Sequence, residues 1–175
     1  LAIADALRAE LELVGENGSE TKVAETSNTA AYEAFLKGRA LVNKRGNEAI
    51  TAGMRELEKS VRLDPNYAPA QAQLAIAITL LTSSSSSYGD LTLTEVNERA
   101  GEQIQATEAL NPNLPELAAA KALLASMNGD GEATIRYADQ ALALRPNYPD
   151  ANNWKINQLN ALGMFREALD AKERL

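Results

Sequence analysis

Three asparagines at helical spacing are the side chains of this 175-residue chain best suited to hold another molecule. Asn153, Asn157 and Asn160 lie at positions i, i+4 and i+7, so on a helix their side chains form one narrow stripe. Each amide carries both hydrogen-bond donors and acceptors, which suits it to bracket the backbone of a bound peptide. Asparagine is a mediocre helix former, so three on one stripe are locally unfavourable. Two interpretations stay open: a peptide-binding surface, or a solvated polar face in a chain rich in asparagine.

The helix that carries this stripe should bury its opposite side, which is formed by Ala151, Leu159 and Leu162. Arg39 is a further candidate binding residue, because it lies on an earlier predicted helix of the same kind. We expect Trp154 to pack in the interior rather than to stack on a ligand.

The carboxylates of the chain do not form a catalytic pair. Glu10 and Glu12, like Glu56 and Glu58, are spaced by two residues, which places them about 200° apart on a helix. The sequence around Asp130 lacks the alternating oxygen ligands of a calcium loop, so this residue is interpreted as a helix cap.

The chain has no cysteine and no histidine. Thiol nucleophiles, imidazole bases, disulfides and the usual zinc ligands are therefore absent from this sequence. We predict no catalytic residue, no cofactor and no metal site, and we expect the protein not to be an enzyme.

The net charge and the hydropathy of the chain limit which partners and compartments are compatible with the sequence. A net charge of −7 argues against a nucleic-acid surface and favours neutral or basic protein segments. No apolar run reaches the roughly 18 residues of a membrane span, and no signal peptide is visible. We expect the chain to be a piece of a longer protein, in either the cytoplasm or the periplasm.

A proline-centred pattern recurs along the chain, as LDPNY at 63–67, LNPNL at 110–114 and LRPNY at 144–148. Proline ends the preceding helix because it disfavours the helical conformation of the residue before it. Pro115 and Pro149 then suit the first turn of the next helix. Pro112 and Pro146 are 34 residues apart, whereas Pro65 and Pro112 are 47 apart, an excess of 13.

A 34-residue period that ends in proline is typical of tetratricopeptide repeats, and the chain resembles that family from residue 27 to residue 175. The glycine turns at 128–131 and 163–165 agree with the family's pattern, while Lys121 stands where the family has an apolar residue. The resemblance implies an all-α solenoid of antiparallel helix pairs, wound into a right-handed superhelix whose first helices line a concave groove. It implies four repeats, at 27–66, 67–113, 114–147 and 148–175, the last one incomplete.

Within the predicted repeats, glycines at 38 and 53 should let two helices approach closely, and Asn47 should cap the second of them. The excess of 13 residues includes a serine-rich insertion at 83–92, interpreted as either a tolerated surface loop or a binding loop. The residues from Thr92 to Glu95 form a capping box that starts the next helix.

Residues 1–26 are predicted to form an amphipathic helix over 1–14, followed by a polar linker. This segment is interpreted as either a cap on the first repeat or the end of an upstream domain. With the sequence AYEAFLKGRA at 31–40, this segment resembles bacterial signalling proteins whose repeats follow a TolB-like domain.

Two functions follow from the resemblance. In the first, the groove binds an extended peptide segment of a partner or of the parent chain, with Asn153, Asn157, Asn160 and Arg39 as contact residues. In the second, the repeats are a structural spacer or self-association module that acts through its exposed end faces.

Overall fold

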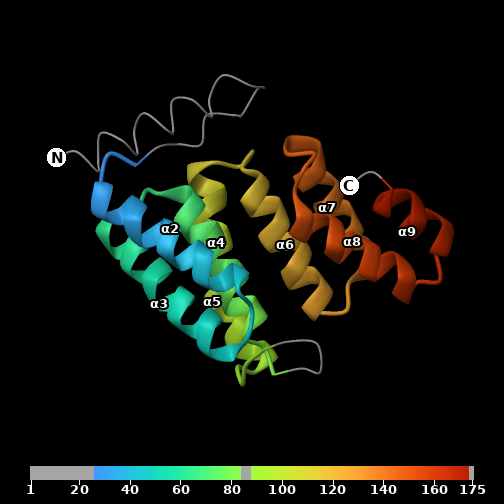
Figure 1. Cartoon of the computed structure of the whole chain (residues 1–175), viewed down its shortest axis with the longest axis horizontal. Coiled ribbons are helices and arrows are strands. Elements are labelled where there is room, and N and C mark those ends of the chain that lie inside the picture. Colours follow the sequence, from blue (N-terminus) through green and yellow to red (C-terminus); the bar gives the residue numbers. More distant parts are fainter. Residues whose placement is uncertain (1–25, 84–87, 174–175) are drawn as a thin grey trace.

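The computed structural model describes residues 26–83 and 88–173, so the helix predicted for residues 1–14 lies outside the described part. The described residues form eight helices and no strand, which confirms the predicted all-α solenoid (Figure 1). The helices are α2 (Thr29–Asn43), α3 (Asn47–Leu63), α4 (Ala68–Leu80), α5 (Leu93–Leu110), α6 (Pro115–Met127), α7 (Gly131–Leu144), α8 (Pro149–Ala161) and α9 (Phe165–Lys172).

The helix boundaries follow local sequence signals. Pro115 and Pro149 are the first residues of α6 and α8, where proline's missing N–H is tolerated. The carboxylate of Asp130 accepts a hydrogen bond from the backbone N–H of Ala133 at 2.9 Å and caps α7, as predicted. The capping box between Thr92 and Glu95 is present at the start of α5.

The predicted cap at Asn47 is wrong. Gly46, with a φ of 87°, is the N-cap of α3, and Asn47 is already the first helical residue. Glycine adopts this left-handed backbone conformation without a steric penalty, so it takes over the turn that precedes the helix. The Asn47 side chain instead donates a hydrogen bond to the carbonyl of Tyr88 at 2.7 Å.

Two glycines bring α2 and α3 into backbone contact, as the sequence predicted. A Cβ atom on Gly38 would lie 2.6 Å from Cγ of Leu57. A Cβ atom on Gly53 would lie 2.8 Å from the carbonyl oxygen of Gly38. Both distances are shorter than side-chain packing allows, so the close approach requires glycine at each position.

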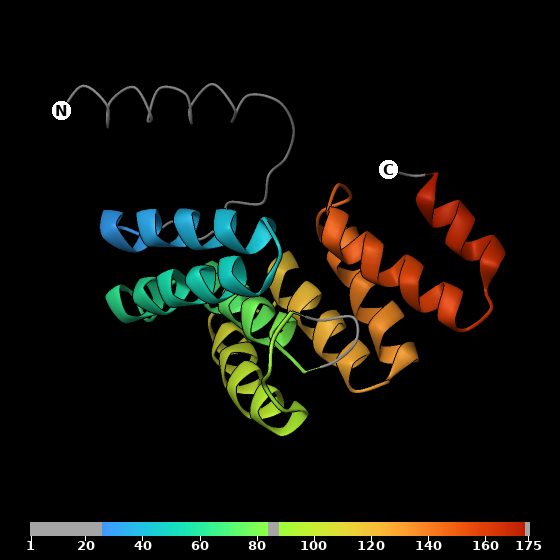
Figure 2. The same ribbon diagram turned by 60° about the horizontal axis from the view of Figure 1, so that its bottom comes forward.

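The pairs stack so that each first helix contacts the next, α2 with α4, α4 with α6 and α6 with α8 (Figure 2). Helix α4 also contacts α3 and α5, and every residue from Ala68 to Leu80 is buried. One hydrophobic core runs from α2 to the start of α8, with Trp154 packed against it. A small second core holds α8 and α9 together.

Lys121 does not disturb the packing of α6, although the family has an apolar residue there. Its Nζ pairs with Oε1 of Glu108 at 2.7 Å and lies 5.8 Å from the centre of the Tyr137 ring. The aliphatic stem therefore lies along the helix pair while the ammonium group reaches a partner near the surface.

The ends of the insertion are anchored to the end of α4. The N–H of Tyr88 donates to the carbonyl of Leu80 at 3.0 Å, and the N–H of Leu91 donates to the carbonyl of Leu81 at 3.0 Å. The backbone of Gly89 runs so close to Leu81 that a Cβ atom there would collide with the Leu81 carbonyl oxygen. Neither interpretation of the insertion, as a tolerated surface loop or as a binding loop, included these backbone contacts.

Among the residues that the structure describes, no helix combines the length and the apolar character needed to cross a membrane.

Candidate binding site

The asparagine stripe lies on an exposed face of α8. Asn153, Asn157 and Asn160 are all exposed, whereas Ala151 and Leu159 on the opposite side are buried. The three side-chain amides form no hydrogen bond with any residue of the described part of the chain. Their donors and acceptors are therefore free for a ligand or for water.

Two neighbours of the stripe behave differently. Asn152 is buried, and its amide donates to the carbonyl of Ala171 at 3.3 Å, so it joins α8 to α9. Leu162 was predicted to be buried with Leu159, but it is 51% exposed. It follows the last residue of α8, and no described helix packs beyond α9 to cover it.

Arg39 lies on α2, exposed and stacked over an aromatic side chain. Its Cζ is 5.2 Å from the centre of the Phe35 ring, and that ring meets the Tyr67 ring edge-on with centres 5.2 Å apart. Within the described residues, no hydrogen bond or ion pair links Arg39 to the asparagines of α8. The structure therefore places the four candidates on two separate helices.

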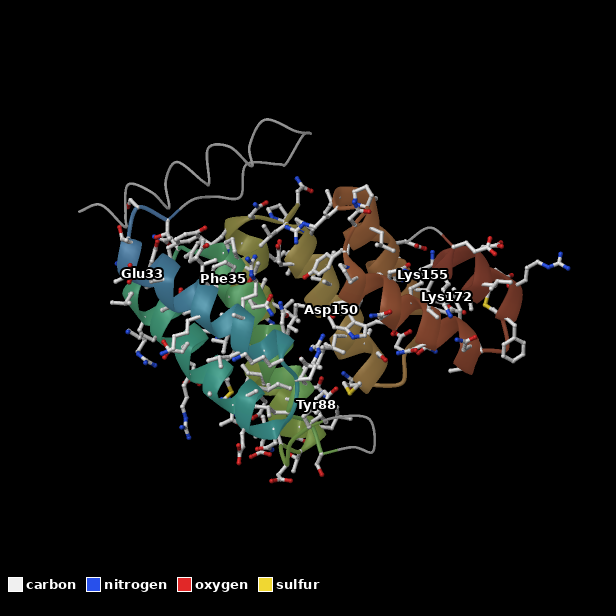
Figure 3. All side chains as sticks on the ribbon, viewed as in Figure 1. Glu33, Phe35, Tyr88, Asp150, Lys155 and Lys172 are labelled. Carbon is white, nitrogen blue, oxygen red and sulfur yellow. The ribbon has the colours of Figure 1, made fainter. Side chains whose placement is uncertain are left out.

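The first helix pair nevertheless touches the fourth. Nη2 of Arg45, in the turn after α2, lies 2.5 Å from Oδ1 of Asp150 in the first turn of α8. The two residues are 105 positions apart in the sequence. In Figure 3, Asp150 lies near the centre of the molecule, beside the end of α2.

A second ion pair lies nearby. Nη2 of Arg145 is 2.5 Å from Oε1 of Glu116, whose side chain is only 8% exposed. Burial raises the pKa of the Tyr148 phenol, and the negative charge of Glu116 raises it further, while the positive charge of Arg39 opposes the shift. Burial likewise raises the pKa of Tyr67, where Arg39 and Glu116 also act in opposite directions.

Arg39 and Glu116 act on both tyrosines, and Arg145 and Asp150 act on Tyr148. Arg45 joins these charged side chains through its ion pair with Asp150. We call them the inter-repeat charge cluster, which consists of Arg39, Arg45, Glu116, Arg145 and Asp150. The cluster is not fully satisfied, because Nη1 of Arg45 and Oε2 of Glu116 are buried without a hydrogen-bond partner in the described structure. Such atoms need water or a ligand group to offset the cost of burial.

Sequence reasoning missed all of this cluster except Arg39. One signal was available: Glu116 and Asp150 occupy the same position in their repeats, four residues after Pro112 and Pro146 respectively. Nothing local in the sequence pointed to Arg45, because its partner belongs to a helix 105 positions away.

The described residues hold no group of three or more acidic, cysteine or histidine side chains that could bind a metal ion.

The stacked helix pairs form an all-α solenoid of helical hairpins, which is the fold that the resemblance to tetratricopeptide repeats implies. The chain is similar to a mutant O-GlcNAc transferase from Thermobaculum terrenum, with a TM-score of 0.55 and 18% identity over 77% of this chain. It spans 23% of that transferase chain. It is also similar to the crystal structure of MamA, with a TM-score of 0.51 and 16% identity over 97% of this chain and 84% of MamA. At these identities the likeness shows the fold alone. No protein-family model and no curated protein matches the sequence.

Proposed function

We propose that the chain is a protein–protein interaction scaffold that binds an extended peptide segment along α8. The observation that carries this proposal is the exposed stripe of Asn153, Asn157 and Asn160, whose amides have no partner in the described structure. An α-helix is unfavourable for asparagine, so a stripe of three needs a compensating role, and ligand binding is one.

The spacing of the stripe fits an extended chain. Residues three and four apart on a helix are separated by roughly 4.5–6 Å along its axis. An extended peptide repeats its backbone groups on one side about every 6.6 Å. Successive amides can therefore each meet an N–H and a C=O of the same peptide edge.

Arg39 lies near the N-terminal end of α8. The side chain is close enough to Tyr148 to act on its pKa, and Tyr148 directly precedes the first residue of α8. A peptide that runs along α8 from Asn160 toward Asp150 would thus approach Arg39 at its far end. The net charge of −7 disfavours polyanionic partners and favours neutral or basic segments.

The test is a peptide array probed with the wild type and with the double variant Asn157→Ala/Asn160→Ala. We expect the variant to lose about tenfold in affinity, since two sets of amide hydrogen bonds disappear. Asn113→Ala/Asn147→Ala is the matched control, because both of these exposed asparagines lie outside the stripe. Capture of the same peptides with equal affinity by a folded stripe variant would show that the stripe is only solvated surface.

We further propose that this scaffold is a regulatory part of a larger bacterial signalling protein, on the basis of the resemblance at residues 31–40. In that case the bound segment belongs either to a partner or to the parent chain. Fragments of the parent chain on the same array distinguish the two sources.

A second candidate function is self-association through the end of the solenoid. The last helix pair exposes four large apolar side chains: Leu162 at 51%, Met164 at 37%, Phe165 at 69% and Leu169 at 56%. Exposed apolar side chains that gather at one end of a solenoid are typical of an interaction surface. Sedimentation velocity of Phe165→Ser/Leu169→Ser should then show a smaller species than the wild type, and identical profiles would exclude this function.

A further inference from the structure

A cavity of about 320 Å³ lies on the side of the molecule formed by the second helices, between α3, α5 and the insertion. It is lined by Asn47, Thr51 and Met54 of α3, by Glu95 and Arg99 of α5, and by Leu81, Gly89, Asp90 and Leu91. The asparagine stripe contributes nothing to this cavity, so it is a separate site.

The insertion supplies one wall of the cavity. Gly89, Asp90 and Leu91 belong to the residues in excess of the 34-residue period. Their position is fixed, because Leu91 hydrogen-bonds to Leu81 and the Asn47 amide donates to the Tyr88 carbonyl. A repeat without the insertion would leave this side open.

The cavity has an acidic end and a basic end. Asp90 and Glu95 lie at the insertion, where α5 begins, and Arg99 lies one turn further along α5 than Glu95. On α3 the lining extends from Asn47 to Met54, which corresponds to roughly 10 Å along the helix. Between the two ends the floor is apolar, formed by Met54, Leu81 and Leu91.

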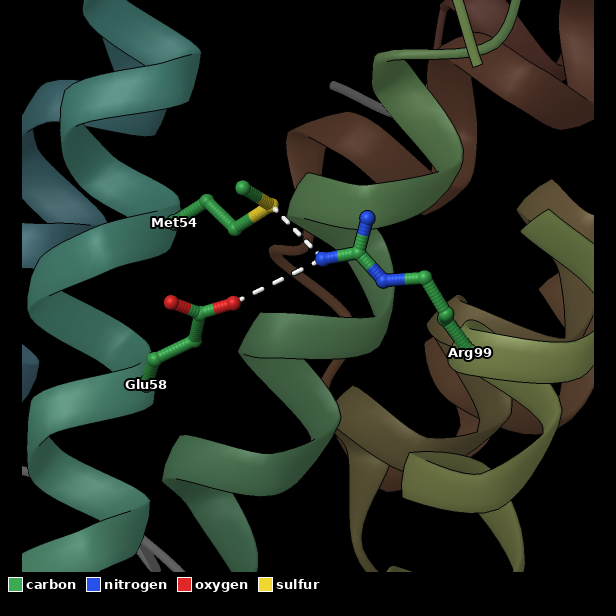
Figure 4. Close-up of polar contacts among 3 residues, drawn as sticks. All are labelled: Met54, Glu58 and Arg99. Atoms are coloured by element: carbon green, nitrogen blue, oxygen red, sulfur yellow. Dashed lines mark hydrogen bonds and ion pairs between the residues drawn. The ribbon is translucent and has the colours of Figure 1, made fainter. Parts of the chain in front are cut away.

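Arg99 is loosely held and has spare donors. Its Nη2 lies 3.5 Å from Oε1 of Glu58 and 3.6 Å from Sδ of Met54, both long contacts (Figure 4). The side chain is 39% exposed, and the other guanidinium nitrogens form no hydrogen bond or ion pair with the described residues. A guanidinium in this state favours a carboxylate, which it can bind through two parallel hydrogen bonds.

At the opposite end the acids have spare acceptors. Oε2 of Glu95 accepts from the backbone N–H and the hydroxyl of Thr92, which leaves Oε1 without a hydrogen bond in the described structure. The hydrogen bonds from Thr92 lower the pKa of Glu95, and the positive charge of Arg99 one turn away lowers it further, so this carboxylate is charged at neutral pH. Asp90 is exposed beside it. Together they favour an ammonium group.

We propose that this cavity binds a short free peptide of two or three residues. The ammonium group lies at Asp90 and Glu95, the carboxylate at Arg99, and an apolar side chain on Met54, Leu81 and Leu91. Two or three extended residues span roughly 7–10 Å, which matches the length of the cavity. A volume of about 320 Å³ is at the lower limit for ligand pockets.

The experiment is an NMR titration of the full 175-residue chain with Gly-Leu-Gly, its C-terminal amide and its N-acetyl form, each to about 10 mM because small ligands bind weakly. We expect Gly-Leu-Gly to shift the backbone signals of Thr51, Leu91 and Glu95, and each blocked form to bind about tenfold more weakly.

Two variants assign the ends of the peptide. Arg99→Gln should weaken binding of Gly-Leu-Gly about tenfold and leave binding of the amide unchanged, because the amide has no carboxylate to lose. Asp90→Asn should weaken Gly-Leu-Gly and leave the N-acetyl form unchanged. Arg166→Gln, on the exposed face of α9, is the charge-matched control and should have no effect.

Three results would overturn the proposal: no shifts with any of the three peptides, equal binding of Gly-Leu-Gly and both blocked forms, or shifts that map to α8 instead of α3 and α5. The first two results leave the proposed function along α8 unaffected, whereas shifts on α8 would support that function and contradict only the cavity proposal.

Discussion

Arg45 has a backbone conformation that few residues other than glycine adopt. Its φ is 59°, in the left-handed region, where the Cβ atom of an L-residue approaches its own backbone. Glycine would fit this turn with less strain, yet an arginine occupies it and reaches Asp150. Arg45 is thus a residue whose local cost is offset by a distant contact.

At this scale we predict a measurable coupling between the two residues of this ion pair. Both side chains are about a quarter exposed, so solvent screens part of their attraction. A double-mutant cycle of Arg45→Asn and Asp150→Asn should give a coupling free energy of about 1 kcal/mol in chemical denaturation. Asparagine tolerates the left-handed conformation, so the variant tests the charge and leaves the turn intact.

The coupling should shrink as salt is added, because ions screen partly exposed charges. Lys37 and Glu56 form a more exposed pair within the first helix pair and provide the control cycle. A coupling between Arg45 and Asp150 no larger than that of the control pair would mean that the contact stabilises the fold no more than an exposed ion pair does.

At the scale of the helix, two glycines inside helices should respond in opposite ways to the same substitution. Gly53→Ala places a Cβ atom 2.8 Å from the carbonyl oxygen of Gly38, so α2 and α3 must separate, with a loss of about 2 kcal/mol. Gly101→Ala on α5 meets no atom within 4 Å and should raise stability by about 1 kcal/mol. Thermal denaturation of the two variants checks both signs, and a stabilising Gly53→Ala would contradict the packing of this pair.

The helices themselves were predictable because their signals are local. Pro115, Pro149 and Asp130 define helix starts through groups within four residues of each other, and the capping box at Thr92 does the same. The cap at Asn47 was wrong because a neighbouring glycine competed for the same position. The hydrogen bonds between the insertion and the end of α4 were missed, because they join backbone groups and therefore do not depend on residue type.

The candidate site was predictable to the same extent. The exposed stripe on α8 follows from helical periodicity alone, so Asn153, Asn157 and Asn160 lie where the sequence placed them, on one face. The side chains around Tyr67 and Tyr148 come from three helices, and their meeting depends on how tightly the pairs are stacked. The periodicity of a single helix carries no information about how tightly the helix pairs stack.

At the scale of the molecule, the contact between Arg45 and Asp150 changes how the array should unfold. In an ordinary solenoid each repeat contacts only its neighbours, so the ends fray first and independently of one another. Here the turn after α2 and the start of α8 hold each other across α4 and α6. Hydrogen exchange should therefore show α2 and α8 opening in the same cooperative step, and in Asp150→Asn the two should exchange at separate rates. Equal coupling of their exchange in the wild type and in the variant would contradict this.

An array whose first and fourth helix pairs are joined by a contact behaves as a loop, and its folding differs accordingly. Closing a loop of 105 residues costs chain entropy before the contact between Arg45 and Asp150 forms. We therefore expect this contact to form late and slowly during folding. Until then the half-formed array exposes its stacking faces to other nascent chains. The ion pair that joins the first and fourth helix pairs in the native state is thus absent during the period in which the chain is most prone to pair with another copy.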